Sequence, residues 1–204
     1  MNKILLAILC AITVGIGAWF SISQKKNEKL DITGFAFPEP AQLANVSLTS
    51  HQNQPVTEDS FKGRWTFIYV GYTFCPDACP ATMTVLNQLH GRLKEKGIDD
   101  TVNMMLVSVD PERDTIENLK EYVAFFNPSF SAATGTPAAI KDFTSQVSAI
   151  YVIPEDRSDP NYLVDHSSSV MLIDPDAAVH AVFTPPQTAE NLANDFVKLS
   201  NRYN

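Results

Sequence analysis

The chain has 204 residues, of which 45% are hydrophobic and 19% are charged, and its formal net charge is −8. This length and balance are typical of one globular domain with its own hydrophobic core, and they argue against an intrinsically disordered chain. An acidic chain repels a phosphate backbone, so the charge argues against a nucleic-acid-binding protein.

An uncharged apolar stretch opens the chain. Residues 4–22 carry no charged side chain, Lys3 precedes them, and Lys25 and Lys26 follow. At about 1.5 Å per residue, a helix of that length approaches the thickness of the hydrocarbon layer of a bilayer. We therefore expect residues 1–23 to form a transmembrane anchor. A cleaved signal segment is the alternative for the same residues.

The stretch that follows has no regular apolar pattern. Residues 24–45 are charged at first and then rich in proline. Such a composition is typical of a tether or an irregular lead-in to a domain. We therefore predict a linker over residues 24–45 and a single globular domain over residues 46–204.

The first elements of this domain alternate between strand and helix. The sequence WTFIYVGY (65–72) is a continuous apolar and aromatic run, which is typical of a buried strand. After two closely spaced cysteines, apolar residues at helical spacing predict a helix. Residues 102–110 predict a second buried strand. Residues 114–128 predict an amphipathic helix that is capped by Asp114 or Thr115.

The second half adds a helix, a pair of strands and a closing helix. Residues 136–152 predict a helix that Thr136 caps and in which Pro137 takes the first position. Residues 168–186 predict two strands joined by a turn, and residues 188–203 predict the last helix. The order strand, helix, strand, helix, helix, strand, strand, helix predicts an α/β domain with a mixed sheet and helices on both faces.

The chain has three cysteines, and their placement points to chemistry. Cys10 lies in the apolar opening stretch, so only Cys75 and Cys79 fall in the globular part, which is too few for a disulfide framework. They follow a predicted buried strand and open a predicted helix. Free backbone N–H groups at a helix amino terminus lower the pKa of a thiol, so we expect both thiols to be reactive or metal-binding.

The spacing of the pair favours a metal over a redox motif. Side chains four residues apart lie on one face of a helix, so the sulfurs of Cys75 and Cys79 can converge on one small ion. The C-x-x-x-C spacing is looser than the C-x-x-C of thiol–disulfide exchange, and two thiolates suit Cu(I) or Zn(II). A structural disulfide is the alternative. Two ligands rarely suffice, so we expect a third elsewhere in the chain.

Four histidines compete for the third position. His51 lies in a polar turn and is expected to be solvated, and His180 is expected to be an ordinary strand residue. His90 follows the second cysteine by eleven residues, which is roughly 16 Å along a helix and too far to share an ion. His166 precedes a late strand, in a loop that can lie beside the cysteines, and Asp165 stands next to it. A loop histidine taken alone is more often solvated than a ligand.

Three segments taken together resemble the Sco/SenC family. They are GYTFCPDACP (71–80), VSVDPERDT (107–115) and VDHSSSVMLIDP (164–175), in the order in which the family has them. The resemblance implies a thioredoxin-like α/β fold, an N-terminal membrane anchor, and a part in copper delivery to cytochrome c oxidase.

The resemblance also implies which residues act. Cys75, Cys79 and His166 match the copper ligands of the family, with Cu(I) preferred and Cu(II) as the alternative. Asp77 and Asp110 match its acidic positions, where they would support the site or recognise a partner. Acids satisfied by backbone N–H groups are an equally good interpretation of both aspartates.

Several roles are compatible with these motifs. The leading one is a metallochaperone that passes copper by ligand exchange to the copper-site subunit of cytochrome c oxidase or to another copper protein. We expect the anchor in a bacterial inner membrane and the globular domain in the periplasm. The second role is a thiol–disulfide oxidoreductase in which Cys75 attacks and Cys79 resolves, so that partner cysteines stay reduced. Weaker alternatives are a peroxidase that uses Arg113 and a disulfide-stapled docking domain.

Overall fold

The computed structural model describes residues 12, 13, 15 and 30–203, and it divides the chain into two units, Met1–Asp31 and Ile32–Asn204. No helix within the described ranges is both long enough and apolar enough to cross a membrane. The predicted anchor lies almost wholly outside the described residues. The anchor and its boundary at residue 23 therefore stay predictions.

The second unit is built on an eight-stranded mixed sheet with the strand order β1-β10-β9-β4-β5-β6-β2-β3. The central strand β4 runs parallel to β5 and antiparallel to β9. Two further strands, β7 and β8, form a separate ribbon. The strands are β1 (Phe35–Gln42), β2 (Leu48–Ser50), β3 (Pro55–Val56), β4 (Trp65–Gly71), β5 (Val102–Ser108), β6 (Ser131–Thr134), β7 (Tyr151–Val152), β8 (Asp165–His166), β9 (Val170–Ile173) and β10 (Ala178–Phe183).

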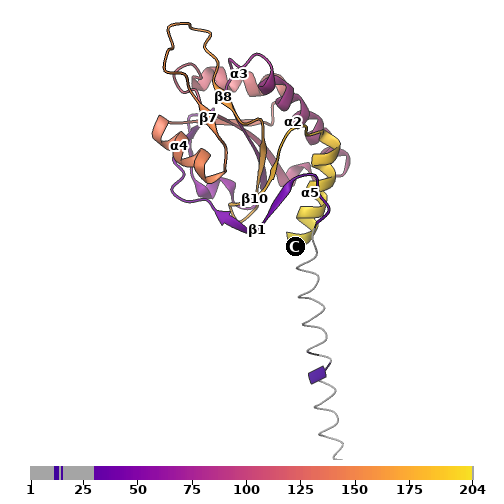
Figure 1. The fold of residues 1–204 in the computed structure, drawn as a ribbon. Helices are drawn as coiled ribbons and strands as arrows, with labels where there is room; N and C mark the ends of the chain where they lie inside the picture. Colours follow the sequence, from indigo (N-terminus) through magenta and orange to yellow (C-terminus); the bar gives the residue numbers. More distant parts are fainter. Residues whose placement is uncertain (1–11, 14, 16–29, 204) are drawn as a thin grey trace, which may run out of the picture. The chain divides into compact units, whose positions relative to one another are not determined.

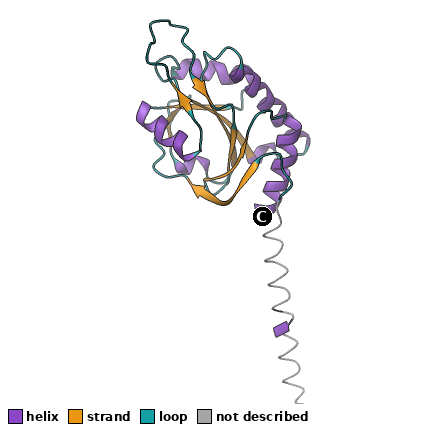
Figure 2. Ribbon diagram, in the orientation of Figure 1, coloured by secondary structure: helices purple, strands orange, loops and turns teal. Residues whose placement is uncertain are grey.

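Helices cover both faces of the sheet (Figures 1 and 2). The connections β4–α2–β5 and β5–α3–β6 join parallel strands in the same direction, so α2 and α3 share a face, where α5 packs against α2. Helix α4 lies on the other face. This confirms the predicted α/β, thioredoxin-like arrangement of the globular part. The helices are α2 (Ala78–Glu95), α3 (Ile116–Phe126), α4 (Pro137–Gln146) and α5 (Ala189–Tyr203), with short 3-10 helices η1 (Glu58–Phe61) and η2 (Asp99–Thr101).

The structure differs from the prediction at the edges of the sheet. Residues 35–42 form β1 and pair with β10, so the irregular lead-in predicted over residues 24–45 is wrong from residue 35 onwards. Its two prolines disguise a strand, and an edge strand tolerates them because one side of it needs no N–H donors. The small residues of β6 also gave no strand signal. Helix α4 ends at Gln146, earlier than predicted, and Ser148 has a φ of 58°.

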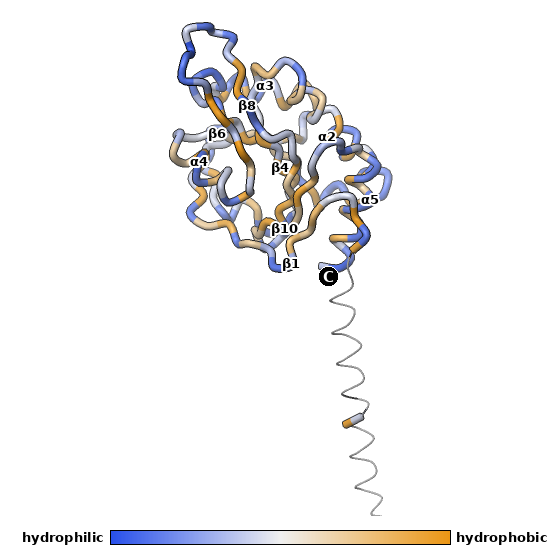
Figure 3. The backbone as a smooth tube through the Cα atoms, in the orientation of Figure 1, coloured by the Kyte–Doolittle hydropathy of each residue, from blue (hydrophilic) through white to orange (hydrophobic). Residues whose placement is uncertain are grey.

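The register of the three central strands brings distant segments to one edge. Every residue of β4 is buried, and its last residue, Gly71, pairs with Ser108 at the end of β5. Because the two strands are parallel, the loops that follow them leave from the same edge. The antiparallel β9 begins there too, since Val170 pairs with Tyr69. Figure 3 shows the hydrophobic strands inside and a mostly hydrophilic connection between β7 and β8 that projects at this edge.

Candidate metal centre

The two cysteines lie where β4 gives way to α2. Cys75 is in the connecting loop and half-buried, whereas Cys79 lies in the first turn of α2 and is completely buried. Both are free thiols, and the backbone N–H of Cys79 donates to Sγ of Cys75 at 3.4 Å. The loop therefore already holds the two side chains together, as their spacing predicted.

A pocket at the end of β4 holds the sulfur of Cys79. The hydroxyl of Tyr69 donates to this sulfur at 3.6 Å, and the backbone N–H of Tyr72 donates at 3.5 Å. The absence of a side chain at Gly71 makes space for this sulfur, because an added Cβ there would lie only 2.7 Å from it. Tyr69 and Gly71 are two residues apart in a strand and thus face the same side. The sequence did not lead us to predict that Tyr69 and Gly71 line the site, although their alternation along a strand could have indicated it.

Burial dominates the acidity of the inner thiol. It raises the pKa of Cys79 to about 12, although the Tyr72 N–H and the Tyr69 hydroxyl both favour the thiolate. The prediction that the helix amino terminus lowers the pKa of both thiols is therefore wrong for Cys79. A cation that binds this sulfur must displace its proton.

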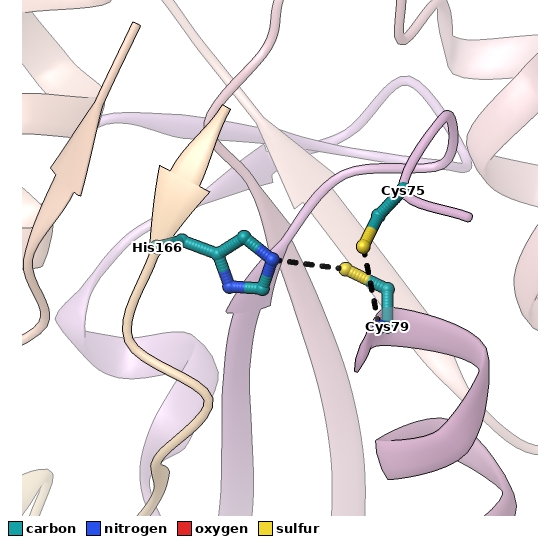
Figure 4. A group of neighbouring side chains, drawn as sticks. All are labelled: Cys75, Cys79 and His166. Carbon is teal, nitrogen blue, oxygen red and sulfur yellow. Dashed lines mark hydrogen bonds between the residues drawn. The ribbon is translucent and has the colours of Figure 1, made fainter. Parts of the chain in front are cut away.

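The imidazole of His166 completes the group. His166 lies in β8, and its Nε2 is 3.4 Å from Sγ of Cys79 (Figure 4). Its Nδ1 lies 3.4 Å from the carbonyl oxygen of Ser167, so Nδ1 carries the hydrogen and Nε2 offers its lone pair. The rings of Tyr69 and Tyr72 pack edge-on to it, with centroids 5.9 and 5.7 Å away. Burial lowers the pKa of His166, which favours the neutral form that a metal requires.

These three side chains are the one group among the described residues whose histidine, cysteine or carboxylate atoms are placed to hold a metal ion. Their ligand atoms all lie within 4.8 Å of one another. Figure 4 shows them converging from the cysteine loop, the start of α2 and β8. Two sulfurs and one imidazole nitrogen form a soft, low-coordinate donor set, which suits Cu(I) better than Mg²⁺ or Ca²⁺.

The remaining histidines lie apart from this group. His90 is on α2, 3.5 Å from the hydroxyl of Ser129. His180 is in β10, as predicted, and its Nδ1 contacts a carboxylate oxygen of Asp174 at 3.2 Å. His51 was expected to be solvated, but it is half-buried, and its Nδ1 accepts a hydrogen bond from the backbone of residue 132. A histidine in a polar turn can thus serve as a local cap for a neighbouring strand.

The acidic residues divide between surface and interior. Asp77, between the cysteines, is exposed and makes no capping hydrogen bond to α2. Asp110 is 1% exposed and contacts Arg113 and Tyr162. Asp114 is not the cap of α3, because the cap is Thr115.

Asp114 instead holds the start of the cysteine loop through hydrogen bonds to Thr73. Its carboxylate accepts hydrogen bonds from the backbone N–H of Thr73 at 3.0 Å, from the hydroxyl of Thr73 at 2.5 Å and from Ser108 at 2.5 Å. Burial raises the pKa of this carboxyl group. Asp114 and Thr115 were both candidates for the cap of α3 in the sequence. Only the tertiary structure shows that Thr115 is the cap and that Asp114 binds Thr73 and Ser108 instead.

Comparisons with known proteins agree with this geometry. The sequence profile of the SCO1/SenC family matches residues 39–201. The crystal structure of Arabidopsis thaliana ScoI with copper bound is 34% identical, with a TM-score of 0.71, and the match covers 81% of this chain and 98% of that chain. Yeast Sco1 with copper bound is 28% identical, with a TM-score of 0.71, over 78% of this chain and 88% of that chain.

A curated relative points the same way. Protein sco1 of Schizosaccharomyces pombe is 32% identical over 202 residues, which cover 92% of this chain and 73% of that protein. The family profile spans most of the chain, and the ligand geometry and the similar folds agree with it. The chain therefore belongs to the SCO1/SenC family.

Proposed function

We propose that the protein binds copper as cargo through Sγ of Cys75, Sγ of Cys79 and Nε2 of His166, and that it delivers the ion during assembly of cytochrome c oxidase. The observation that carries this proposal is the convergence of the three ligand atoms within 4.8 Å. The similar structures of Arabidopsis ScoI and yeast Sco1 with copper bound support copper as the ion. Two thiolates and a neutral imidazole favour Cu(I), and Cu(II) would recruit a further oxygen ligand.

The surroundings of the site suit transfer to another protein. Four large apolar side chains near the ligands are exposed: Phe74 by 48%, Ile150 by 72%, Val152 by 59% and Leu163 by 59%. An apolar rim of this kind favours a protein partner. We propose that this partner is the copper-site subunit of cytochrome c oxidase or another copper protein. One of its ligands would bind the ion at the half-exposed Cys75 while a ligand of this chain leaves.

A membrane location is part of the proposal. The uncharged stretch 4–22 supports an anchor formed by residues 1–23, with the globular domain in the bacterial periplasm. A similar structure, 25% identical, is described as a SCO1/SenC family lipoprotein from Bacillus anthracis, and it associates a related domain with a membrane. Carbonate extraction of the full chain from membranes, together with protease treatment of spheroplasts, tests both the anchor and the orientation.

Anaerobic titration with Cu(I) against a competing chelator tests the proposed site. The reduced full chain should bind one ion, and His166→Ala should lower the affinity by at least about 100-fold, since a ligand contributes more than the 10–100-fold that is typical of a residue supporting a ligand. The variants Cys75→Ser and Cys79→Ser should lose more. Unchanged affinity in His166→Ala would overturn the three-ligand site.

A second candidate function is thiol–disulfide exchange, in which Cys75 attacks a partner disulfide and Cys79 resolves the mixed disulfide. The half-exposed thiol of Cys75 and the N–H of Cys79 directed at its sulfur favour this role. The arginine of the peroxidase alternative, Arg113, pairs with Asp110 through Nε, and its side chain is 11% exposed. Reduction of a disulfide in an oxidised copper-site partner, compared between the wild type and Cys75→Ser, separates exchange from copper delivery.

A further inference from the structure

The short turn formed by residues 110–114, at the end of β5, contacts both of the loops that carry the candidate ligands. Through Asp114 it holds Thr73, two residues before Cys75. Through Asp110 and Arg113 it holds the chain that leads into β8 and His166. Neither group of contacts involves a ligand atom, so the turn does not belong to the metal centre itself.

Three contacts of Asp110 and Arg113 join the turn to the chain before β8, and an ion pair between these two residues supports them. The hydroxyl of Tyr162 donates to Oδ1 of Asp110 at 2.7 Å, and Nε of Arg113 donates to Oδ2 at 2.6 Å. Nη1 of Arg113 donates to the carbonyl oxygen of Pro160 at 2.9 Å. The guanidinium carbon of Arg113 also lies 3.5 Å from the centre of the Tyr162 ring. We call Asp110, Arg113 and Tyr162 the latch.

The carboxylate at the centre of the latch is buried, and the arginine that pairs with it is largely shielded from solvent. Asp110 is 1% exposed and the Arg113 side chain 11%. A buried ion pair adds little net stability, because desolvation offsets its attraction, but removing one partner leaves an uncompensated charge. The planar guanidinium engages Asp110, Pro160 and the Tyr162 ring in fixed directions, which a lysine does not reproduce.

The latch also contacts two further aromatic residues near the site. The guanidinium of Arg113 lies 4.9 Å from the ring of Phe74, which precedes Cys75. It lies 5.6 Å from the ring of Tyr72, whose hydroxyl accepts a hydrogen bond from the N–H of Val164 at 3.1 Å. His166 follows Val164 by two residues, and the Tyr72 ring packs against its imidazole. One largely shielded cation thus lies between the two ligand-bearing loops.

We propose that the latch positions His166: Arg113, with Asp110 and Tyr162, fixes the loop before β8 against the cysteine loop, so that Nε2 of His166 reaches the two sulfurs. This inference rests on the proposed copper site. When the latch is weakened, the thiolates stay in place and the imidazole is presented less often. The site then behaves as two thiolates with a third ligand that coordinates the ion only part of the time.

Two conservative variants of the full chain test this role. Tyr162→Phe keeps the ring and removes one hydrogen bond to Asp110, and Arg113→Lys keeps the charge and removes the planar fork. Both should lower Cu(I) affinity by about 10-fold, the effect typical of residues that orient a ligand, and should weaken the imidazole nitrogen hyperfine coupling in the EPR spectrum of the Cu(II) form. The matched control is Arg157→Lys, which alters a salt bridge between the same chain before β8 and Glu112 of the turn and should change neither, because that pair is exposed and contributes little.

A double-mutant cycle separates positioning from a general structural role. In a His166→Ala background, Tyr162→Phe should cause no further loss of copper affinity, because the ligand it positions is absent. An equal loss in both backgrounds, or wild-type affinity and EPR spectra in the single variants, would overturn the latch.

A measurement on the copper-free protein keeps the test independent of the proposed function. Hydrogen exchange of the Val164 amide should be about 10-fold faster in Tyr162→Phe, while the Ala178 amide, which donates to Asp174 elsewhere in the sheet, should be unchanged. A wild-type protein that does not bind copper refutes the proposed function, whereas unchanged Val164 exchange refutes the latch.

Discussion

One histidine packs against aromatic rings at each end of the central strand β4, His180 at the beginning and His166 at the end. The two histidines differ in the partner that faces their ring nitrogen. At the beginning of β4, Trp65 packs edge-on to His180 with ring centroids 5.2 Å apart, and Tyr203 packs nearby. Nδ1 of His180 is 3.2 Å from Oδ2 of Asp174, whose other oxygen accepts two backbone N–H groups. The protein itself supplies the partners at this closed end.

At the other end of β4, two of the proposed ligand atoms face each other. Nε2 of His166 faces the sulfur of Cys79 at 3.4 Å, and that thiol is protonated because burial raises its pKa. No carboxylate or basic side chain stands where Asp174 stands beside His180, among the described residues that contact the imidazole. Both histidines pack against aromatic rings. The atom opposite the ring nitrogen, more than burial, thus distinguishes the proposed ligand His166 from the core residue His180.

The largest expected effect comes from removing each histidine in turn. His180→Ala removes a partner of the buried Asp174 and opens space beside Trp65, so the free energy of unfolding should fall by about 2–3 kcal/mol. His166→Ala removes no charged partner and should cost less than about 1 kcal/mol, although it should lower copper affinity by at least about 100-fold. Urea denaturation of both copper-free variants, together with copper titration of His180→Ala, measures the contrast. Loss of copper affinity in His180→Ala would contradict the proposed difference between the two ends of β4.

The elements that the sequence predicted well are those whose signal is local. The unbroken apolar run of β4 and the Thr136 cap with Pro137 in α4 each depend on residues close in the chain, and the structure confirms them. Strand β1 was missed because its prolines oppose the strand pattern, and only its pairing with β10 makes it a strand. Local signals therefore predicted the interior of the sheet better than its edges.

The site required information that no local pattern contains. The spacing of Cys75 and Cys79 predicted that their sulfurs converge, but the residues alone left His166 as one histidine among four, and only the family resemblance selected it. Its position depends on the register between β4 and β9, which pairs Tyr69 with Val170. The acidity of Cys79 depends on the same packing, so helix position alone predicted it wrongly.

A smaller effect should follow from filling the space beside Cys79. Gly71→Ala places a Cβ 2.7 Å from the sulfur, so the sulfur or the strand must move, and stability should fall by about 1–3 kcal/mol. Copper affinity should fall about 10-fold as the sulfur leaves its position. The control is Gly91→Ala on α2, where nothing lies within 4 Å of the added carbon and stability should rise by up to about 1 kcal/mol. Calorimetry and copper titration of both variants provide the test, and equal effects would contradict it.

Copper affinity should also depend on pH at the open end of β4. Cys79 has a pKa of about 12, so between pH 7 and 8 its thiol is protonated in the free protein and loses the proton when copper binds. The affinity should therefore rise about 10-fold per pH unit from this thiol alone, which is about 1.4 kcal/mol. His166, whose pKa is lowered, is already neutral in this range and adds no slope. Titrations at three pH values measure it. The slope should persist in His180→Ala, and a flat profile in the wild type would contradict the assignment.

The smallest effect should come from the hydroxyl of Tyr69. Tyr69→Phe removes one of the two donors to the sulfur of Cys79 but keeps the ring against His166, and the N–H of Tyr72 still donates at 3.5 Å. A hydrogen bond to sulfur is weak, so copper affinity should change by about 3-fold and stability by no more than about 1 kcal/mol. The matched change at the closed end is Tyr203→Phe, which should leave copper affinity untouched. A change beyond 10-fold in Tyr69→Phe would mean that the hydroxyl, rather than burial and the backbone, fixes the sulfur, whereas any copper effect of Tyr203→Phe would show that the two ends of β4 are coupled.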